Sequence, residues 1–138
     1  MSDTKFLIGT SGWGYPEWKD VFYPNNLHQS EFLLFYSEIF YTTEINTTFY
    51  QIPSNKTVQK WATVSPDDFL FSAKVPQDIT HKSKLNLEIC ADQFNYFIKV
   101  MNPLIESNKL LALLLQLPPS FEKTKHFQAL KEFIQFSA

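Results

Sequence analysis

Glu44 and Lys74 are charged residues in segments that otherwise consist mostly of apolar or β-branched residues. A positioned carboxylate can remove a proton from a substrate, and a lysine can stabilise the negative charge that then develops. A lysine with a lowered pKa can also form a Schiff base, but a neighbouring carboxylate would keep Lys74 protonated. Structural ion pairs also occur in such places, so the two residues are either a catalytic pair or an ion pair that only stabilises the fold.

His81 is the third candidate for catalysis, because an imidazole can serve as an acid or as a metal ligand. A loop histidine whose ring nitrogens are hydrogen-bonded is an equally good interpretation. Glu44 and His81 would supply two metal ligands, whereas a catalytic zinc site generally takes three from the protein. We therefore consider Glu44, Lys74 and His81 as candidate catalytic residues and assign no metal site; no cofactor is identified.

Aromatic residues make up 17% of the chain, and seven of them lie in two predicted loops, residues 10–29 and 47–54. These loop aromatics are Trp13, Tyr15, Trp18, Phe22, Tyr23, Phe49 and Tyr50. An aromatic face beside amide and carboxylate groups suits the stacking of a sugar ring or a base. Trp13 and Tyr50 are predicted to contact a ligand, whereas Trp18, Phe22 and Phe49 are predicted to pack the loops together.

Hydrophobic periodicity predicts the elements that position these side chains. Strands are expected at residues 6–9, 41–46, 69–75 and 110–116, and helices at 30–39, 55–65, 87–104 and 124–136. Ser30 is the expected N-cap of the first helix, and Phe127, Leu130, Phe133 and Ile134 are the expected inward side of the last. Strand and helix alternate four times, which argues for a parallel sheet with right-handed crossovers. The leucine run at 110–115 is typical of a parallel sheet covered on both faces.

Alternation along the predicted strands brings the polar residues together. Glu44 and Asn46 share one face of their strand, and Lys74 shares a face with Ser72. Gln116 lies on the same face as Leu114 at the end of the fourth strand. These side chains should converge at the carboxyl ends of the strands, where βα-barrel enzymes hold their active sites. Asn46 and Gln116 are therefore predicted to bind ligand together with Trp13 and Tyr50.

The three glycines of the chain, Gly9, Gly12 and Gly14, are confined to one turn and follow the spacing GxxGxG. A doubly wound dinucleotide-binding sheet would instead have GxGxxG directly before its first helix. The remaining architecture is half of an eightfold βα barrel, whose full size is typically about 250 residues.

Several sequence blocks carry a resemblance to one family. They are GTSGWGYPEW at 9–18, FYP at 22–24, EINTTFY at 44–50, FLFSAK at 69–74, ITH at 79–81 and QLPPSF at 116–121. In order and spacing they resemble the YecE-like family, domain of unknown function 72. The resemblance implies a βα barrel of the triosephosphate-isomerase type and brings no reaction with it. Residues 1–138 are then expected to be a single domain, the N-terminal half of a truncated barrel whose other strands are absent.

Two positions depart from that family. Its members tend to have arginine where this chain has Gln51, and again just before the Ile-Thr-His block, where it has Gln77 and Asp78. If those arginines bind an anion in the family, this chain lacks the side chains that would do so.

Composition excludes several classes of protein. The net charge is −2, and all 12 basic residues are lysines, which argues against a protein that wraps duplex nucleic acid. The lone Cys90 cannot form an internal disulfide, and the longest apolar run, 110–115, is far shorter than the roughly twenty residues of a membrane span. The chain begins without a signal-peptide pattern, so a cytoplasmic location and no membrane partner are expected.

Three functional hypotheses remain. The first is an enzyme-type fold that binds a small polar ligand, such as a sugar, nucleoside or phosphorylated metabolite, with hydrolase or lyase chemistry. The second is a non-catalytic module for single-stranded nucleic acid that uses the same aromatics with Lys74, Lys82 and Lys84. The third is an inactive fragment. Since a half barrel leaves two strand edges open, self-association is also expected.

Overall fold

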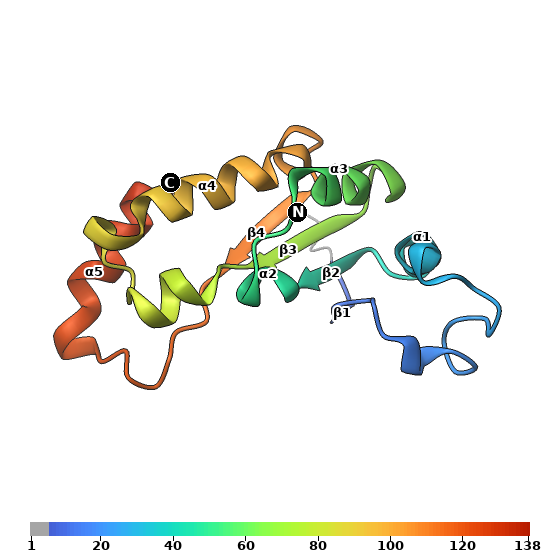
Figure 1. The fold of residues 1–138 in the computed structure, drawn as a ribbon, viewed down its shortest axis with the longest axis horizontal. Coiled ribbons are helices and arrows are strands. Elements are labelled where there is room, and N and C mark those ends of the chain that lie inside the picture. The colour runs from blue at the N-terminus through green and yellow to red at the C-terminus, as the bar shows by residue number, and fades with distance from the viewer. Residues whose placement is uncertain (1–5) are drawn as a thin grey trace, which may run out of the picture.

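The computed structural model describes residues 6–138 and shows an α/β fold around one four-stranded parallel sheet. Its strands are β1 (Gly9–Ser11), β2 (Thr42–Ile45), β3 (Leu70–Lys74) and β4 (Leu110–Leu114), in the spatial order β1-β2-β3-β4. The α-helices are α1 (Phe32–Ser37), α2 (Thr47–Tyr50), α3 (Asn55–Val64), α4 (Leu87–Glu106) and α5 (Lys123–Phe136). Figure 1 shows α5 at the opposite end of the molecule from α1 and the first long loop.

The first strand lies further along the chain than its hydrophobic pattern predicts. Residues 6–9 were expected to form it, yet β1 pairs with β2 only from Gly9 to Ser11. The two backbones approach closely at Gly9, where an added Cβ atom would lie 1.9 Å from the carbonyl oxygen of Thr42. The apolar Phe6 and Ile8 precede the paired segment and are exposed.

The four predicted helices are present. The structure differs from the prediction at the start of the first helix and in two of the predicted loops. The expected N-cap, Ser30, instead lies in a 3-10 turn (Gln29–Glu31), and the His28 side chain accepts a hydrogen bond from the Ser30 backbone N–H. Two predicted loops contain helical turns: α2 in residues 47–54, and η3 (Asp78–Lys82) in residues 76–86. The last two helices keep their predicted places within two residues.

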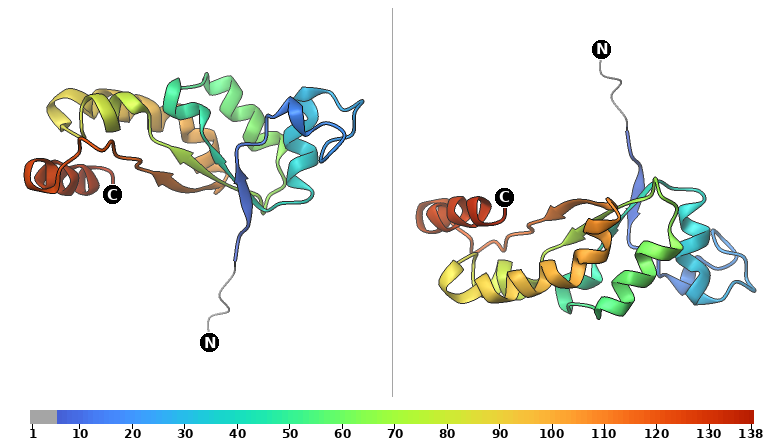
Figure 2. Two further views of the ribbon diagram at one scale, coloured as in Figure 1. Left: turned by 90° about the horizontal axis from the view of Figure 1, so that it is seen from below. Right: turned by 90° about the horizontal axis from the view of Figure 1, so that it is seen from above.

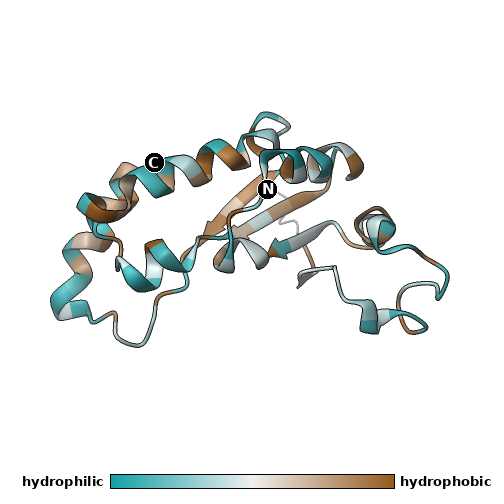
Figure 3. Cartoon of the chain, in the orientation of Figure 1, coloured by the Kyte–Doolittle hydropathy of each residue, from teal (hydrophilic) through white to brown (hydrophobic). Residues whose placement is uncertain are grey.

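Helices α3 and α4 cover one face of the sheet, and the core lies between them and the strands (Figure 2). Ile45, Phe71 and Ala73 point from the strands into this core and are buried, as the alternation predicts. Figure 3 shows how strongly apolar β3 and β4 are. The opposite face carries a row of residues in register across the four strands: Ser11, Glu44, Ser72 and Ala112.

That opposite face is not covered by any helix among residues 6–138 (Figure 2). A register shift between Phe71 and Ser72 leaves Leu111 unpaired in a bulge, and both Leu111 and Leu114 are exposed. On α5, Phe133 is buried and Leu130 is half-buried, but Phe127 and Ile134 are exposed against expectation. Fewer of the apolar residues of α5 are therefore buried than its helical periodicity predicts.

Lys109 is a buried lysine just before β4. Its Nζ donates hydrogen bonds of 2.7 Å to the carbonyl oxygens of Ala62 and Ser65, at the end of α3. A cation is favourable here for two reasons. The end of a helix leaves carbonyl groups without hydrogen-bond partners, and it carries the negative end of the helix dipole. Lys109 thus fastens α3 to the start of β4.

Within residues 6–138 no helix is both long enough and apolar enough to cross a bilayer.

Candidate functional site

Glu44 and Lys74 meet at the carboxyl ends of β2 and β3. The Lys74 Nζ lies 3.7 Å from Glu44 Oε1, and the two side chains are 16% and 27% exposed, respectively. The register of β2 and β3 places Glu44 beside Ser72. Lys74 follows Ser72 by two residues, so its side chain lies on the same face of the sheet, close to Glu44. The predicted convergence of this pair is confirmed.

Ser11 links the pair to β1. Its hydroxyl donates a hydrogen bond of 3.0 Å to Glu44 Oε1, and the amide nitrogen of Asn46 donates to the same Ser11 oxygen. A hydroxyl has one proton to donate, so these bonds run in one direction, from Asn46 through Ser11 to Glu44. The Asn46 Oδ1 atom is buried and has no hydrogen-bond partner within residues 6–138.

Ser11 was missed by the sequence analysis because it fell in the loop after the predicted strand at residues 6–9. The signal that could have found it is the two-residue alternation that selected Glu44. With β1 placed at Gly9–Ser11, Ser11 pairs with Glu44 in register and points to the same face.

Phe49 connects Lys74 with His81. The Lys74 Nζ lies 5.6 Å from the centre of the Phe49 ring, within the range of a cation–π contact, and the His81 ring packs edge-on against Phe49 at 5.0 Å. His81 Nδ1 also hydrogen-bonds Thr80 Oγ1 at 3.0 Å. Phe49 therefore packs between Lys74 and His81 at the edge of the candidate site.

Thr48 fixes the segment that carries Phe49. Its side chain is fully buried, and its hydroxyl lies 2.6 Å from the carbonyl oxygen of Lys74 and 3.0 Å from that of Ile45. These bonds attach the short helix α2 to the ends of both β2 and β3. Because α2 is attached to the strand ends in this way, the position of Phe49 relative to Glu44 is set by the sheet.

Trp13 borders a pocket that also includes Asn46. The pocket has a volume of about 220 Å³ and is lined by Gly12, Trp13, Gly14, Tyr15, Ile45, Asn46, Thr47 and Trp61. The Trp13 ring packs edge-on against Trp61 at 5.6 Å, and the Tyr15 hydroxyl donates to the Ser11 carbonyl oxygen at 2.5 Å. Asn46 borders both this pocket and the hydrogen-bond chain to Glu44.

The first long loop holds its own aromatic cluster. Trp18 and Phe22 pack around Tyr23, which stacks on Phe32 with ring centres 4.0 Å apart. Burial raises the pKa of the Tyr23 phenol, so it stays protonated and donates a 2.6 Å hydrogen bond to the Trp13 carbonyl oxygen. The predicted packing role of Trp18 and Phe22 is confirmed, and the cluster holds the Trp13 backbone in place.

Two predicted ligand-binding residues lie apart from this arrangement. Tyr50 is exposed, and its ring packs edge-on against Phe49. Gln116 lies two residues beyond β4, is exposed and forms no hydrogen bond or ion pair with the described part of the chain. The structure thus assembles Glu44, Lys74 and Asn46 closely, and His81 through Phe49.

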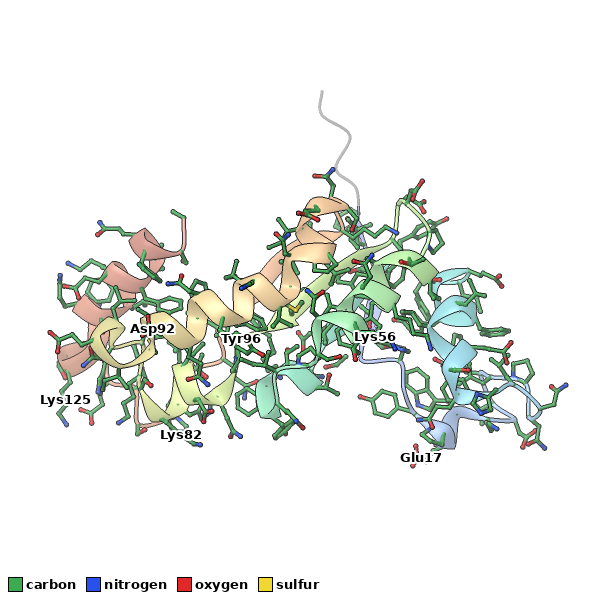
Figure 4. All side chains as sticks on the ribbon, turned by 45° about the horizontal axis from the view of Figure 1, so that its top comes forward. Glu17, Lys56, Lys82, Asp92, Tyr96 and Lys125 are labelled. Carbon is green, nitrogen blue, oxygen red and sulfur yellow. The ribbon has the colours of Figure 1, made fainter. Side chains whose placement is uncertain are left out.

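The lysines of the nucleic-acid hypothesis have other partners. Lys82 forms an ion pair with Asp78 at 2.5 Å, and the Lys84 Nζ donates to the Ser120 carbonyl oxygen at 3.3 Å. Figure 4 shows Lys82 near Lys125, at the end of the molecule formed by α5. Hydrogen bonds from Lys82 and Gln93 lower the pKa of Asp78.

Within residues 6–138 there is no group of three or more histidine, cysteine, aspartate or glutamate side chains placed to hold a metal ion. Glu44 and His81 belong to no such cluster.

The fold and this geometry define an α/β protein with a parallel sheet and a polar site at the carboxyl ends of its strands. The chain belongs to the family described as Protein of unknown function DUF72, whose model matches residues 7–138, and this confirms the resemblance seen in the sequence. No activity comes with that family description.

Relatives and solved structures agree with this assignment. The chain is 31% identical to the UPF0759 protein YunF of Bacillus subtilis over 86% of its own length and 42% of that protein. It is 32% identical to the UPF0759 protein YecE of Escherichia coli over 83% of its length and 38% of that protein. A DUF72 family protein of Thermotoga maritima superposes with a TM-score of 0.76 at 32% identity, covering 92% of this chain and 51% of that one. A DUF72 family protein of Enterococcus faecalis superposes with a TM-score of 0.68 at 29% identity, covering 78% of this chain and 44% of that one. The chain therefore spans about half or less of the length of these proteins.

Proposed function

We propose that the carboxyl ends of β1, β2 and β3 form a binding site for a small polar ligand. The observation that carries this proposal is the ion pair of Glu44 and Lys74, which is partly withdrawn from solvent on the face without helices. Charged groups are costly to withdraw from water, and an ion pair by itself is a weak source of stability. Ser11 and Asn46 orient the carboxylate further, as a site for recognition requires.

The chemistry we propose is hydrolysis or proton abstraction. Glu44 would take the proton, and Lys74 would stabilise the negative charge that develops on the substrate. His81, which reaches Lys74 through the Phe49 ring, is proposed as a second acid–base group. Trp13 and Tyr50 offer aromatic faces for a ring, and Gln116 would add an amide from the β4 side.

Among the proposed ligands, neutral ring compounds fit the charges better than phosphorylated ones. Lys74 is the cation at the site, and Glu44 already neutralises it. The chain also lacks arginine, the side chain that binds phosphate with two parallel hydrogen bonds. A sugar or nucleoside could instead donate hydroxyl protons to Glu44 and stack on Trp13 or Tyr50.

We further propose that the whole chain is a single domain with the architecture of half a βα barrel of the triosephosphate-isomerase type. Four successive parallel strands with helices on one face support this proposal. So does the superposition of nearly the whole chain on about half of a solved DUF72 structure. In such a barrel the open face of the sheet would be the barrel interior, and the ion pair would lie at its mouth.

Thermal unfolding in the presence of defined probes tests the binding site. The probes are glucose, adenosine and glycerol phosphate, each in large excess over the protein. A ligand that binds the folded chain raises its melting temperature, so at least one probe should do so. Glu44→Gln should abolish that increase, whereas Glu17→Gln, an exposed glutamate in the first loop (Figure 4), should leave it unchanged.

An increase that survives Glu44→Gln would place the ligand elsewhere, and no increase with any of the three probes would contradict the proposal. A Glu44→Gln variant that fails to fold would make Glu44 a structural residue. Binding of a single-stranded oligonucleotide that weakens steeply with salt would favour the non-catalytic alternative.

A further inference from the structure

We propose that a pocket between α1 and α3 is a second binding site, which takes a small aromatic compound with an anionic group. The pocket has a volume of about 410 Å³, within the range of about 300–1,000 Å³ that is usual for small-molecule sites. Neither Glu44 nor Lys74 lines it, so this inference does not rest on the binding site proposed at the strand ends. The lining residues that define the ligand are Trp13, Leu33, Lys56, Lys60, Trp61 and Val64.

Helix α3 forms one wall of this pocket with a side that the core does not use. Val58 and Ala62 point into the core and are buried. Lys60, Trp61 and Val64 follow one another at helical spacing along the pocket instead. The helix therefore presents two lysine side chains, Lys56 (Figure 4) and Lys60, beside an aromatic ring.

Lys56 and Lys60 supply positive charge that the described part of the chain does not neutralise. They lie four residues apart on α3, so their side chains are neighbours on the helix surface. Both are exposed, and neither forms a hydrogen bond, ion pair or cation–π contact within residues 6–138. Lys74, by contrast, is paired with Glu44 at 3.7 Å. An anion would therefore find a free cation in this pocket and a neutralised one at the strand ends.

The placement of the two lysines is unfavourable for the helix itself. Neither α3 nor the pocket lining contains an acidic residue. The nearby Glu31 carboxylate accepts a hydrogen bond of 3.2 Å from the His28 backbone N–H instead. Like charges four residues apart repel each other, and Lys56, the second residue of α3, is also opposed by the helix dipole. An anion bound between the two ammonium groups would offset both effects.

Trp13 and Trp61 give the pocket its apolar surface. Their rings pack edge-on at 5.6 Å, and Trp13 packs in the same way against the buried Phe71 at 6.1 Å. The Tyr23 phenol holds the Trp13 backbone, so this surface is formed before any ligand arrives. A flat ring suits such a surface, and a lysine binds carboxylate or phosphate as a point charge. The ring and the negative charge therefore define the class of ligand.

Isothermal titration calorimetry with three compounds that share one ring system tests the site. The compounds are 1-naphthaleneacetate, its neutral amide 1-naphthaleneacetamide, and 1-naphthyl phosphate. At least one of the two anions should bind about tenfold or more tightly than the amide, as expected for hydrogen bonds to a charged group. The anion that binds more tightly identifies the ligand group as a carboxylate or a phosphate.

Variants of the two lysines test where the anion binds. Lys56→Gln combined with Lys60→Gln should bind the preferred anion as weakly as the amide, whereas arginine at both positions should keep the preference. Lys99→Gln is the matched control and should bind like wild type, because Lys99 is exposed on α4 and has no ion-pair partner in the described residues. Trp61→Leu should weaken the anion and the amide alike, since it removes the ring and keeps both lysines.

Equal affinity for anions and amide, no binding of either anion, or an equal loss of affinity in Lys99→Gln would each overturn this inference. Circular dichroism establishes that each variant is folded; if Trp61→Leu unfolds, the exposed lysine substitutions carry the test. Glu44→Gln separates the two sites and should leave binding of the naphthyl anion unchanged. If Glu44→Gln abolishes that binding, the compound lies at the strand ends and the second site is refuted. If glucose, adenosine and glycerol phosphate all fail while an anion binds through the two lysines, the proposed function is wrong and this site stands.

Discussion

The Ser11 hydroxyl donates a hydrogen bond of 3.0 Å to Glu44 Oε1, although the two residues lie 33 positions apart in the chain. The bond exists because β1 and β2 pair in a register that places Ser11 directly beside Glu44. The bond joins the end of β1 to the ion pair of Glu44 on β2 and Lys74 on β3. The geometry of the candidate site therefore depends on how closely the backbones of β1 and β2 approach.

Gly9→Ala should disrupt that approach. The new Cβ atom would lie 1.9 Å from the Thr42 carbonyl oxygen, so β1 would have to move away from β2. We expect a loss of about 1–3 kcal/mol in the free energy of unfolding, the usual cost of overpacking. Gly14→Ala is the matched control, because nothing lies within 4 Å of a Cβ there, and it should change the stability by less than about 0.5 kcal/mol. Urea denaturation of both variants provides the measurement, and equal effects would show that the contact at Gly9 relaxes freely.

Lys109→Met should destabilise the chain at the junction of α3 and β4. The substitution removes the ammonium group and leaves the buried carbonyl oxygens of Ala62 and Ser65 without that donor. An unsatisfied buried acceptor costs about 1–3 kcal/mol, so we expect a loss of at least about 2 kcal/mol. Lys99→Met, on the exposed side of α4, should have little effect. Denaturation at one fixed protein concentration compares the two variants, and a Lys109→Met variant as stable as wild type would show that water replaces the ammonium.

Asp78→Asn should reduce stability only while Asp78 is ionised. Because the folded state lowers the pKa of this carboxyl below its ordinary 3.8, its stabilising contribution is present above that value. The contribution is lost as the pH falls through the lowered pKa. We expect wild type to exceed Asp78→Asn by less than about 1 kcal/mol at neutral pH, since the side chain is 41% exposed, and the difference to vanish in acid.

Unfolding followed by circular dichroism across the acid range measures this difference. Asp92→Asn serves as the control, because Asp92 is exposed on α4 (Figure 4) and has no ion-pair partner in the described residues. A difference that grows as the pH falls would contradict the assigned direction of the pKa shift.

Cys90 should react slowly with thiol reagents in the native protein. It is fully buried on α4, and burial raises its pKa, so the reactive thiolate is both inaccessible and disfavoured. We expect its reaction with a disulfide reagent to be at least about a hundredfold slower than in denaturant, because labelling requires opening of the core. The rate is measured from the absorbance of the released thiol. Labelling at the denatured rate would mean that α4 does not protect this part of the core.

Much of the fold could be read from the sequence because period and composition are local properties. Apolar alternation located β2, β3 and β4, and helical spacing located α3, α4 and α5, each within a few residues. The same alternation identified Glu44, Asn46 and Lys74 as one polar group at the carboxyl ends of the strands. The prediction failed at β1, since the contact of Gly9 with Thr42 depends on a residue that follows a loop and a helix.

The sequence by itself determined the family, the parallel order of strands and helices, and the face on which Glu44 and Lys74 lie. Only the tertiary structure decided which other side chains contact Glu44 and Lys74. Ser11 reaches Glu44 through strand register, Phe49 reaches Lys74 and His81 through the turn that Thr48 anchors, and Gln116 stays apart. The physical reason is that hydrogen-bond and ring distances depend on the relative placement of distant segments. Periodicity specifies only which way each residue points along its own segment.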